Sequence, residues 1–157
     1  GNPGGYLNEC IDIASHFIKK GEVVTYTIDK YGQKVVSESV GGDYLGLPLV
    51  VLVDGGSASA SEVVTGALRD HGAATIIGTT TFGKGIVQQL IPLTNDKGGL
   101  KVTTSKYYTP NGENIHKTGI APNIEVTIPS ELLEQTYDRN NDPQFNKAVE
   151  EINKMNN

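Results

Sequence analysis

The chain has 157 residues, a formal net charge of −5 at pH 7 and a hydrophobic fraction of 37%. This length fits one domain with its own core, which we place at residues 1–157. The lysines are scattered among acidic residues, which argues against nucleic acid or an anionic membrane as the main partner. No apolar run approaches the roughly 20 residues that a membrane span needs.

Residue types that usually bind metals are few. The single cysteine, Cys10, cannot form an internal disulfide, and its place on the apolar face of a predicted helix favours a core position. The histidines lack metal-ligand spacing; they are His16, His71 and His116. We therefore expect no metal site.

The first elements are a helix and a hairpin. Apolar residues at helical spacing over 7–18 predict an amphipathic helix that ends by Gly21. Residues 22–28 and 34–40 flank a turn with Gly32 and predict a β-hairpin. The continuous apolar run "LPLVVLVD" that follows, residues 47–54, is typical of a strand buried on both faces.

The remaining elements alternate between helices and strands. Helical spacing resumes at Ala60 and stops at Gly72. Strands are then expected at 73–78, 85–93, 100–109 and 123–128, with a glycine-rich turn at 94–99. Asp142 and Pro143 form a good N-cap and first position for a final helix, about 142–153. This alternation predicts an α/β fold with a mixed sheet.

Three serines stand between the apolar strand and the next helix, in "GGSASASEVV", residues 55–64. A strand, a glycine turn and a helix can lift a nucleophile out of a sheet and direct backbone N–H groups at it. The structural alternative is that Ser57 or Ser59 caps the helix, with Glu62 completing a capping box with Ser59. The motif is not G-x-S-x-G, so the nucleophile elbow of α/β hydrolases is not supported.

A serine nucleophile needs a base, and the histidines show no acidic partner nearby in the sequence. Lys84, between Gly83 and Gly85, is the alternative candidate, because a lysine can act as a base when burial lowers its pKa. An exposed turn lysine is the other interpretation. The stretch from Gly78 also reads G-x-x-x-x-G-K, but Gly85 and a β-like segment follow, which excludes a P-loop.

Several stretches together resemble the carboxyl-terminal processing (tail-specific) proteases, a family of Ser/Lys endopeptidases. The matching segments follow the family's order over nearly the whole chain: "NPGG" (2–5), "GSASASE" (56–62), "TFGKG" (81–85), "VQ" (87–88), "KYYTPNGENI" (106–115), "GIAPNIEV" (119–126) and "DPQFNKAVE" (142–150). The resemblance implies catalysis.

The resemblance also implies roles for individual residues. Ser59 would be the nucleophile, Lys84 the general base, and Gln88 the residue that orients the lysine. The oxyanion hole would be formed by the N–H groups of Ala60 and of Gly5, which is chosen over Gly4. Ser57 and Ser61 would be structural, and no metal or cofactor would be needed.

The fold implied is the crotonase-like (Clp-protease/crotonase) β-β-α superhelix. Family members carry an upstream PDZ domain, an N-terminal signal or membrane anchor, and a strand before "NPGG". We expect this chain to be a core without them. The oxyanion loop would then be untethered, and an open sheet edge could pair into a homodimer. The resemblance further implies an extended peptide substrate and, for bacterial members, a site outside the cytoplasm.

One other function remains open. It is a binding or scaffold module of the same fold, or an inactive piece of the protease, although a pure binder has no need of Ser59, Lys84 and Gln88 together. An acyl-CoA enzyme of the crotonase type is not supported, because such enzymes stabilise an enolate and do not need a Ser/Lys pair.

Overall fold

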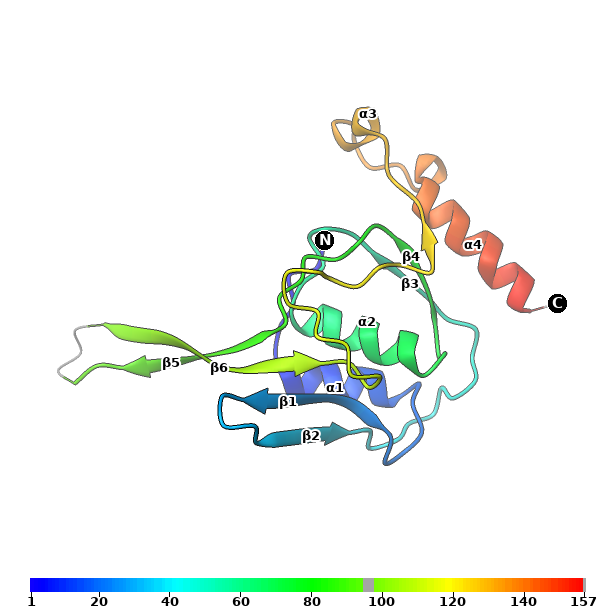
Figure 1. The fold of residues 1–157 in the computed structure, drawn as a ribbon. Coiled ribbons are helices and arrows are strands. Elements are labelled where there is room, and N and C mark those ends of the chain that lie inside the picture. Colours follow the sequence, from blue (N-terminus) through cyan, green and yellow to red (C-terminus); the bar gives the residue numbers. More distant parts are fainter. Residues whose placement is uncertain (95–97, 157) are drawn as a thin grey trace.

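The computed structural model describes residues 1–94 and 98–156. The helices α1 (Leu7–Ser15) and α2 (Ala60–Asp70) pack against each other, and α2 lies between two sheets (Figure 1). Their apolar faces, together with Val24 of β1, bury the central core: Cys10, Ala14, Ile18, Val24, Ala60, Val63, Ala67 and Leu68. The core position predicted for Cys10 is confirmed.

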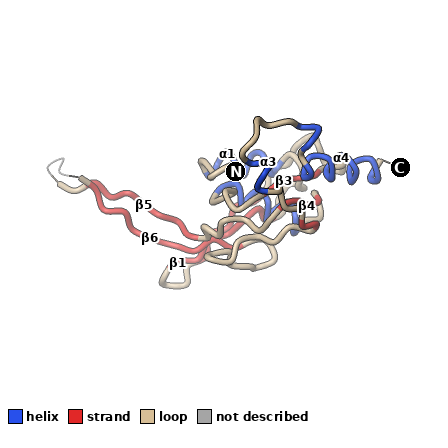
Figure 2. The backbone as a smooth tube through the Cα atoms, turned by 90° about the horizontal axis from the view of Figure 1, so that it is seen from above, coloured by secondary structure: helices blue, strands red, loops and turns tan. Residues whose placement is uncertain are grey.

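The first sheet is antiparallel, in the order β2-β1-β6-β5. Its strands are β1 (Val23–Asp29), β2 (Lys34–Glu38), β5 (Ile86–Pro92) and β6 (Gly99–Tyr108). The β5–β6 hairpin extends well beyond the rest of the molecule (Figures 1 and 2). Part of the glycine-rich turn expected at 94–99 falls on residues 95–97, which lie outside the described residues.

The second sheet is parallel, in the order β3-β4-β7. It consists of β3 (Val50–Val53), β4 (Thr75–Gly78) and the short β7 (Ile124–Glu125). The strands are thus divided between an antiparallel and a parallel sheet, and the α/β class is confirmed.

The prediction that the 47–54 strand is buried on both faces is wrong. Val53 is buried, whereas Leu52 is 40% exposed. β3 is an edge strand of the parallel sheet. Helix α4 (Pro143–Met155) packs on it, but side chains such as Leu52 stay partly in solvent.

The C-terminal segment adds elements that the sequence pattern did not indicate: α3 (Ser130–Leu133) and a 3₁₀ turn, η1 (Arg139–Asn141). Helix α4 begins where the Asp-Pro pair predicts. The Asp142 carboxylate accepts hydrogen bonds from Gln144 N (2.8 Å) and Phe145 N (3.1 Å), which caps the helix.

Candidate active site

Ser59 stands at the junction of β3 and α2 in an unusual backbone conformation. Its φ is 60° and its ψ −118°, whereas an ordinary N-cap residue has extended angles. A non-glycine residue with positive φ is uncommon, and such sparsely populated backbone regions cost on the order of 1–3 kcal/mol. A sharp strand-to-helix turn of this kind is what exposes the nucleophile in hydrolases that lack any other likeness to this chain.

The predicted capping box is present, but it works mainly through the glutamate. The Ser59 N–H donates to Glu62 Oε2 at 2.8 Å. In the other direction the Glu62 N–H donates to the Ser59 carbonyl oxygen at 2.9 Å and also faces the Ser59 side chain, so both halves of the capping box are present. Ser59 thus occupies the cap position, and its unusual backbone angles are the feature that capping does not explain.

Glu62 is fully buried and joins two parts of the candidate site. Besides the Ser59 N–H, its carboxylate accepts from Lys84 N at 2.9 Å, Gly83 N at 2.7 Å and Thr81 Oγ1 at 2.6 Å. All four partners are donors, so the carboxylate acts only as an acceptor. One side chain thus fixes the backbone of Ser59 relative to that of Lys84.

Thr81 links Glu62 to a third segment of the chain, which contains Ile120. Its hydroxyl donates to Glu62 and accepts from Ile120 N at 2.7 Å. The close approach needs glycine: Gly119 has φ +71°, and a Cβ there would stand 2.2 Å from the Thr81 carbonyl oxygen. The sequence pattern indicates a capping box for Glu62 and no role for Thr81. The signal that could have indicated their contact is the charged Glu62 among the apolar positions at the start of the helix.

The loop of residues 2–5 lies against the turn that contains Ser59. The Ala58 N–H donates to the Asn2 carbonyl at 3.0 Å, and a Cβ on Gly4 would lie 2.7 Å from the Ala58 carbonyl oxygen and 3.0 Å from Ala60 N. The loop is held in place by these contacts, so the expectation of an untethered loop is wrong.

Two backbone N–H groups of this region are free among the described residues. The Gly4 N–H is occupied, because it donates to Asn2 Oδ1 at 2.9 Å. Within the described part of the chain, neither the Gly5 N–H nor the Ala60 N–H has an acceptor. This difference favours Gly5 over Gly4 as a donor to a ligand.

The two neighbouring serines differ in their surroundings. Ser57 is buried and its hydroxyl accepts from Asp54 N at 3.1 Å, which stabilises the turn. Ser61, in the first turn of α2, lines a small pocket beside the 2–5 loop.

Lys84 and Gln88 lie on the side of the site nearer the hairpin. The Lys84 backbone is anchored by Glu62, and its side chain is half-buried. Lys84 precedes β5, and Gln88 lies within this strand with its side chain exposed. Within the described residues, no hydrogen bond joins the Lys84 ammonium to the Ser59 hydroxyl or to the Gln88 amide. Such contacts often tighten only in the complex with substrate.

The histidines have other surroundings. His71 contacts Glu22 through Nδ1 (3.0 Å) and Val23 O through Nε2 (2.7 Å), and His16 packs its ring against Tyr44. The backbone of His116 packs against the lysine turn, where a Cβ on Gly85 would lie 2.6 Å from His116 N. Its Nδ1 atom is buried with no hydrogen-bond partner among the described residues.

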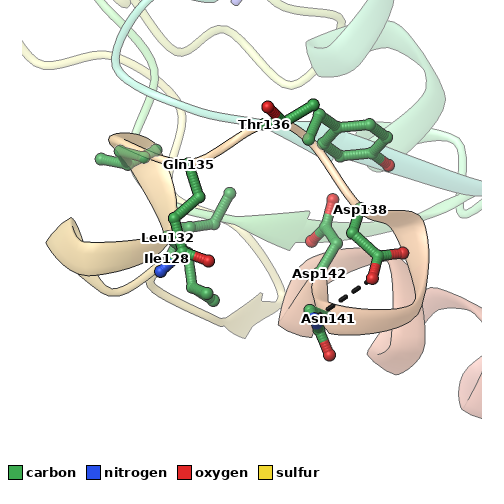
Figure 3. A pocket seen from close by; sticks show the side chains of 9 residues that line it. Ile128, Leu132, Gln135, Thr136, Asp138, Asn141 and Asp142 are labelled. Carbon is green, nitrogen blue, oxygen red and sulfur yellow. Dashed lines mark hydrogen bonds between the residues drawn. The ribbon is translucent and has the colours of Figure 1, made fainter.

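A second hollow lies in the C-terminal segment, between Ile128 and Asp142 (Figure 3). Its polar groups serve local structure: Asp138 accepts from Asn141 Nδ2 at 3.2 Å and from Asn140 N at 2.9 Å, and Asp142 caps α4. None of the candidate catalytic residues lines it.

Two further features concern metal binding and membrane crossing, both within the described residues. No group of His, Cys, Asp and Glu in that part of the chain is arranged to hold a metal ion. In the same part, no helix combines the length and the apolar character needed to cross a membrane.

Comparison with known proteins identifies close relatives. The chain is 46% identical over 138 residues to a carboxy-terminal-processing protease of Bartonella bacilliformis, and 42% identical over 129 residues to the carboxy-terminal processing protease CtpB of Bacillus subtilis. These matches cover 87% and 82% of this chain, but 32% and 27% of the relatives. The chain therefore spans about a third of the length of its relatives.

Solved structures agree with this relationship. The photosystem II D1 C-terminal processing protease superposes with a TM-score of 0.70 at 34% identity, over 80% of this chain and 32% of that one. The tricorn protease shares the fold, with a TM-score of 0.57 at 20% identity over 99% of this chain and 14% of its own. The crotonase-like fold expected from the sequence is thereby confirmed. Residues 1–126 match peptidase family S41, and the chain belongs to this family.

Proposed function

We propose that this chain is the catalytic core of a serine endopeptidase that cleaves protein chains near their C-terminal ends. Ser59 is the nucleophile, Lys84 the general base and Gln88 the residue that orients the lysine. The N–H groups of Gly5 and Ala60 form the oxyanion hole. Family membership supports the protease class. The backbone geometry supports the roles of Ser59, Ala60 and Gly5, whereas the roles of Lys84 and Gln88 rest on the family resemblance.

One observation carries the assignment of the nucleophile. Ser59 is held at φ 60° at the start of α2, and the next residue, Ala60, has a backbone N–H with no acceptor among the described residues. A serine that served only as a cap would adopt extended angles. The strained backbone instead favours a residue whose position is set by chemistry.

The reaction proceeds through an acyl-enzyme. Lys84, in its uncharged form, takes the proton from Ser59 as Oγ attacks the peptide carbonyl, and the oxyanion accepts hydrogen bonds from Gly5 and Ala60. One such donor contributes about 3 kcal/mol to transition-state stabilisation. The C–N bond then breaks, the amine leaves with a proton from the lysine, and water releases the acyl group by the reverse sequence.

The substrate of this reaction is a peptide in extended form. Such a peptide can add to an open strand edge, and β3 and β5 each have one unpaired edge among the described strands. The same edges would permit pairing into a homodimer. By analogy with the family, we place the protein outside the cytoplasm of a bacterium.

Covalent labelling tests the nucleophile directly. The purified chain is treated with a serine-directed fluorophosphonate, and the adduct is located by intact mass and peptide mapping. We expect one adduct on Ser59 and none in Ser59→Ala, whose stability should change by no more than about 2 kcal/mol, the upper range for a lost cap.

The matched control is Ser130→Ala, which removes a serine from the exposed start of α3 and should leave the labelling unchanged. A folded chain that remains unlabelled at Ser59, yet binds an extended peptide, would favour the binding-module alternative. Labelling at another serine would refute the assignment of Ser59.

A further inference from the structure

A pocket of about 170 Å³ opens beside the proposed nucleophile. Its walls come from the 2–5 loop, from α1 and from the first turns of α2; the residues the argument uses are Gly5, Glu9, Cys10, Ile13, Ala60 and Val64. An engineered protein cavity of about 150 Å³ holds a benzene molecule. The space therefore suits one aliphatic side chain of moderate size.

The position of the pocket says which substrate residue reaches it. Gly5 and Ala60 line the pocket and also carry the two free N–H groups. A carbonyl oxygen held by these groups places the adjoining Cα, and hence that residue's side chain, at the mouth of the pocket. This step rests on the proposed function, because it takes the two N–H groups as the oxyanion hole.

The lining of the pocket combines apolar side chains with one acidic side chain. Cys10, Ile13 and Val64 supply carbon and sulfur surface. Glu9 is the only charged side chain among the described residues that line it. Its carboxylate is solvent-exposed and free to face an incoming side chain.

Glu9 acts electrostatically on Cys10, another residue that lines the pocket. Burial, and then the negative charges of Glu9 and Asp12, raise its pKa to about 11. The two carboxylates on α1 therefore disfavour a negative charge at the pocket wall, and a carboxylate brought by a substrate would meet the same repulsion.

We propose that Glu9, which lines this pocket, makes the site discriminate against aspartate and glutamate as the residue whose carbonyl is attacked. Glu9 is then a specificity residue: it does not touch the reacting atoms, and its charge selects among substrates.

The test uses peptidyl diphenyl phosphonates that differ only in the side chain next to phosphorus: leucine, asparagine or aspartate. Ser59 Oγ forms a bond to phosphorus, phenoxide leaves, and the serine proton passes to the base and then to phenoxide. The rate of adduct formation on Ser59 is followed by intact mass. We expect leucine to react fastest and asparagine several-fold faster than aspartate, since the two differ mainly in charge.

Substitutions at Glu9 isolate the effect of its charge. Glu9→Gln should raise the aspartate rate about three- to tenfold relative to asparagine, the range expected for one partly screened charge over a few ångström. Glu9→Lys should reverse the preference. Glu131→Gln, an exposed carboxylate on α3, is the matched control and should change neither rate.

The outcomes separate the two proposals. If no phosphonate labels Ser59 in the folded chain, the proposed function fails and the pocket assignment fails with it. If Ser59 is labelled but the ratio of asparagine to aspartate is the same in Glu9→Gln and Glu9→Lys as in the original chain, only the role of Glu9 is overturned.

Discussion

The two sides of the candidate site are held very differently. On one side, the buried Glu62 carboxylate ties the backbones of Ser59, Gly83 and Lys84 together. On the other, Gln88 lies exposed in β5, in a hairpin that extends away from the core (Figure 1). Large apolar side chains of this hairpin are in solvent: Leu90, Ile91, Leu93 and Leu100. In the proposed function, the folded core therefore positions Ser59, whereas a side chain of the projecting hairpin orients Lys84.

Among the substitutions around Ser59, replacement of Glu62 should have the largest effect on stability. In Glu62→Gln one acceptor oxygen becomes an NH₂ group that faces buried donors. We expect the free energy of unfolding to fall by about 2–4 kcal/mol, and labelling of Ser59 to slow by more than tenfold. Urea denaturation and the rate of phosphonate labelling measure the two effects. An unchanged stability would mean that the Glu62 carboxylate does not hold Ser59 and the backbone of Gly83 and Lys84 together.

Gly4 and Gly5 form a matched pair within the 2–5 loop, the proposed oxyanion loop. Gly4→Ala places a Cβ 2.7 Å from the Ala58 carbonyl at φ +103°, and should cost about 1–3 kcal/mol of stability and slow labelling. A Cβ on Gly5 meets no atom within 4 Å. Gly5→Ala should therefore change stability by less than about 0.5 kcal/mol. Equal destabilisation by both substitutions would argue against the tight contact at Gly4.

At Ser59 a substitution by glycine should stabilise the fold, in contrast to Gly4→Ala. Ser59→Gly removes the proposed nucleophile but relieves a positive φ, so its free energy of unfolding should exceed that of Ser59→Ala by about 1 kcal/mol. Thermal melts of the two variants give the comparison. If Ser59→Ala were the more stable variant, the backbone at this position would not be strained.

Substitutions in the β5–β6 hairpin should change the stability least. Gln88→Ala should leave the unfolding free energy within about 0.5 kcal/mol of the original, because the side chain is exposed, while it slows labelling of Ser59. Gln89→Ala, at the adjacent exposed position, is the control and should keep the original rate. Equal rates in both variants would exclude Gln88 from positioning the lysine.

Much of the fold could be predicted because its signals are local. Periodic apolar residues gave the main helices, and the Asp142-Pro143 pair gave the start of α4. The exposure of Leu52 could not be predicted, because it depends on which strand forms the edge of the sheet. The short α3 and η1 have too few residues to show a period.

The candidate site likewise has a part that the sequence could predict and a part that depends on the folded structure. Resemblance to a known family suggested Ser59, Lys84 and Gln88, and the strand-turn-helix order suggested why a serine stands there. The charge of Glu62 at the start of the helix hints at a buried contact, but its partners Thr81, Gly83 and Lys84 could not be inferred, because they are distant in the chain and are brought together only by folding. The positive φ of Ser59 is likewise a property of the folded turn.

The central claim is that Lys84 activates Ser59, and the most direct measurement is the rate of Ser59 phosphonylation in Lys84→Arg. A guanidinium stays protonated at any usable pH and cannot accept the serine proton. Loss of a general base typically costs a factor of about 10²–10⁴, so labelling should slow by at least a hundredfold, while Lys117→Arg should react at the original rate. Labelling of Lys84→Arg at the original rate would show that another group is the base.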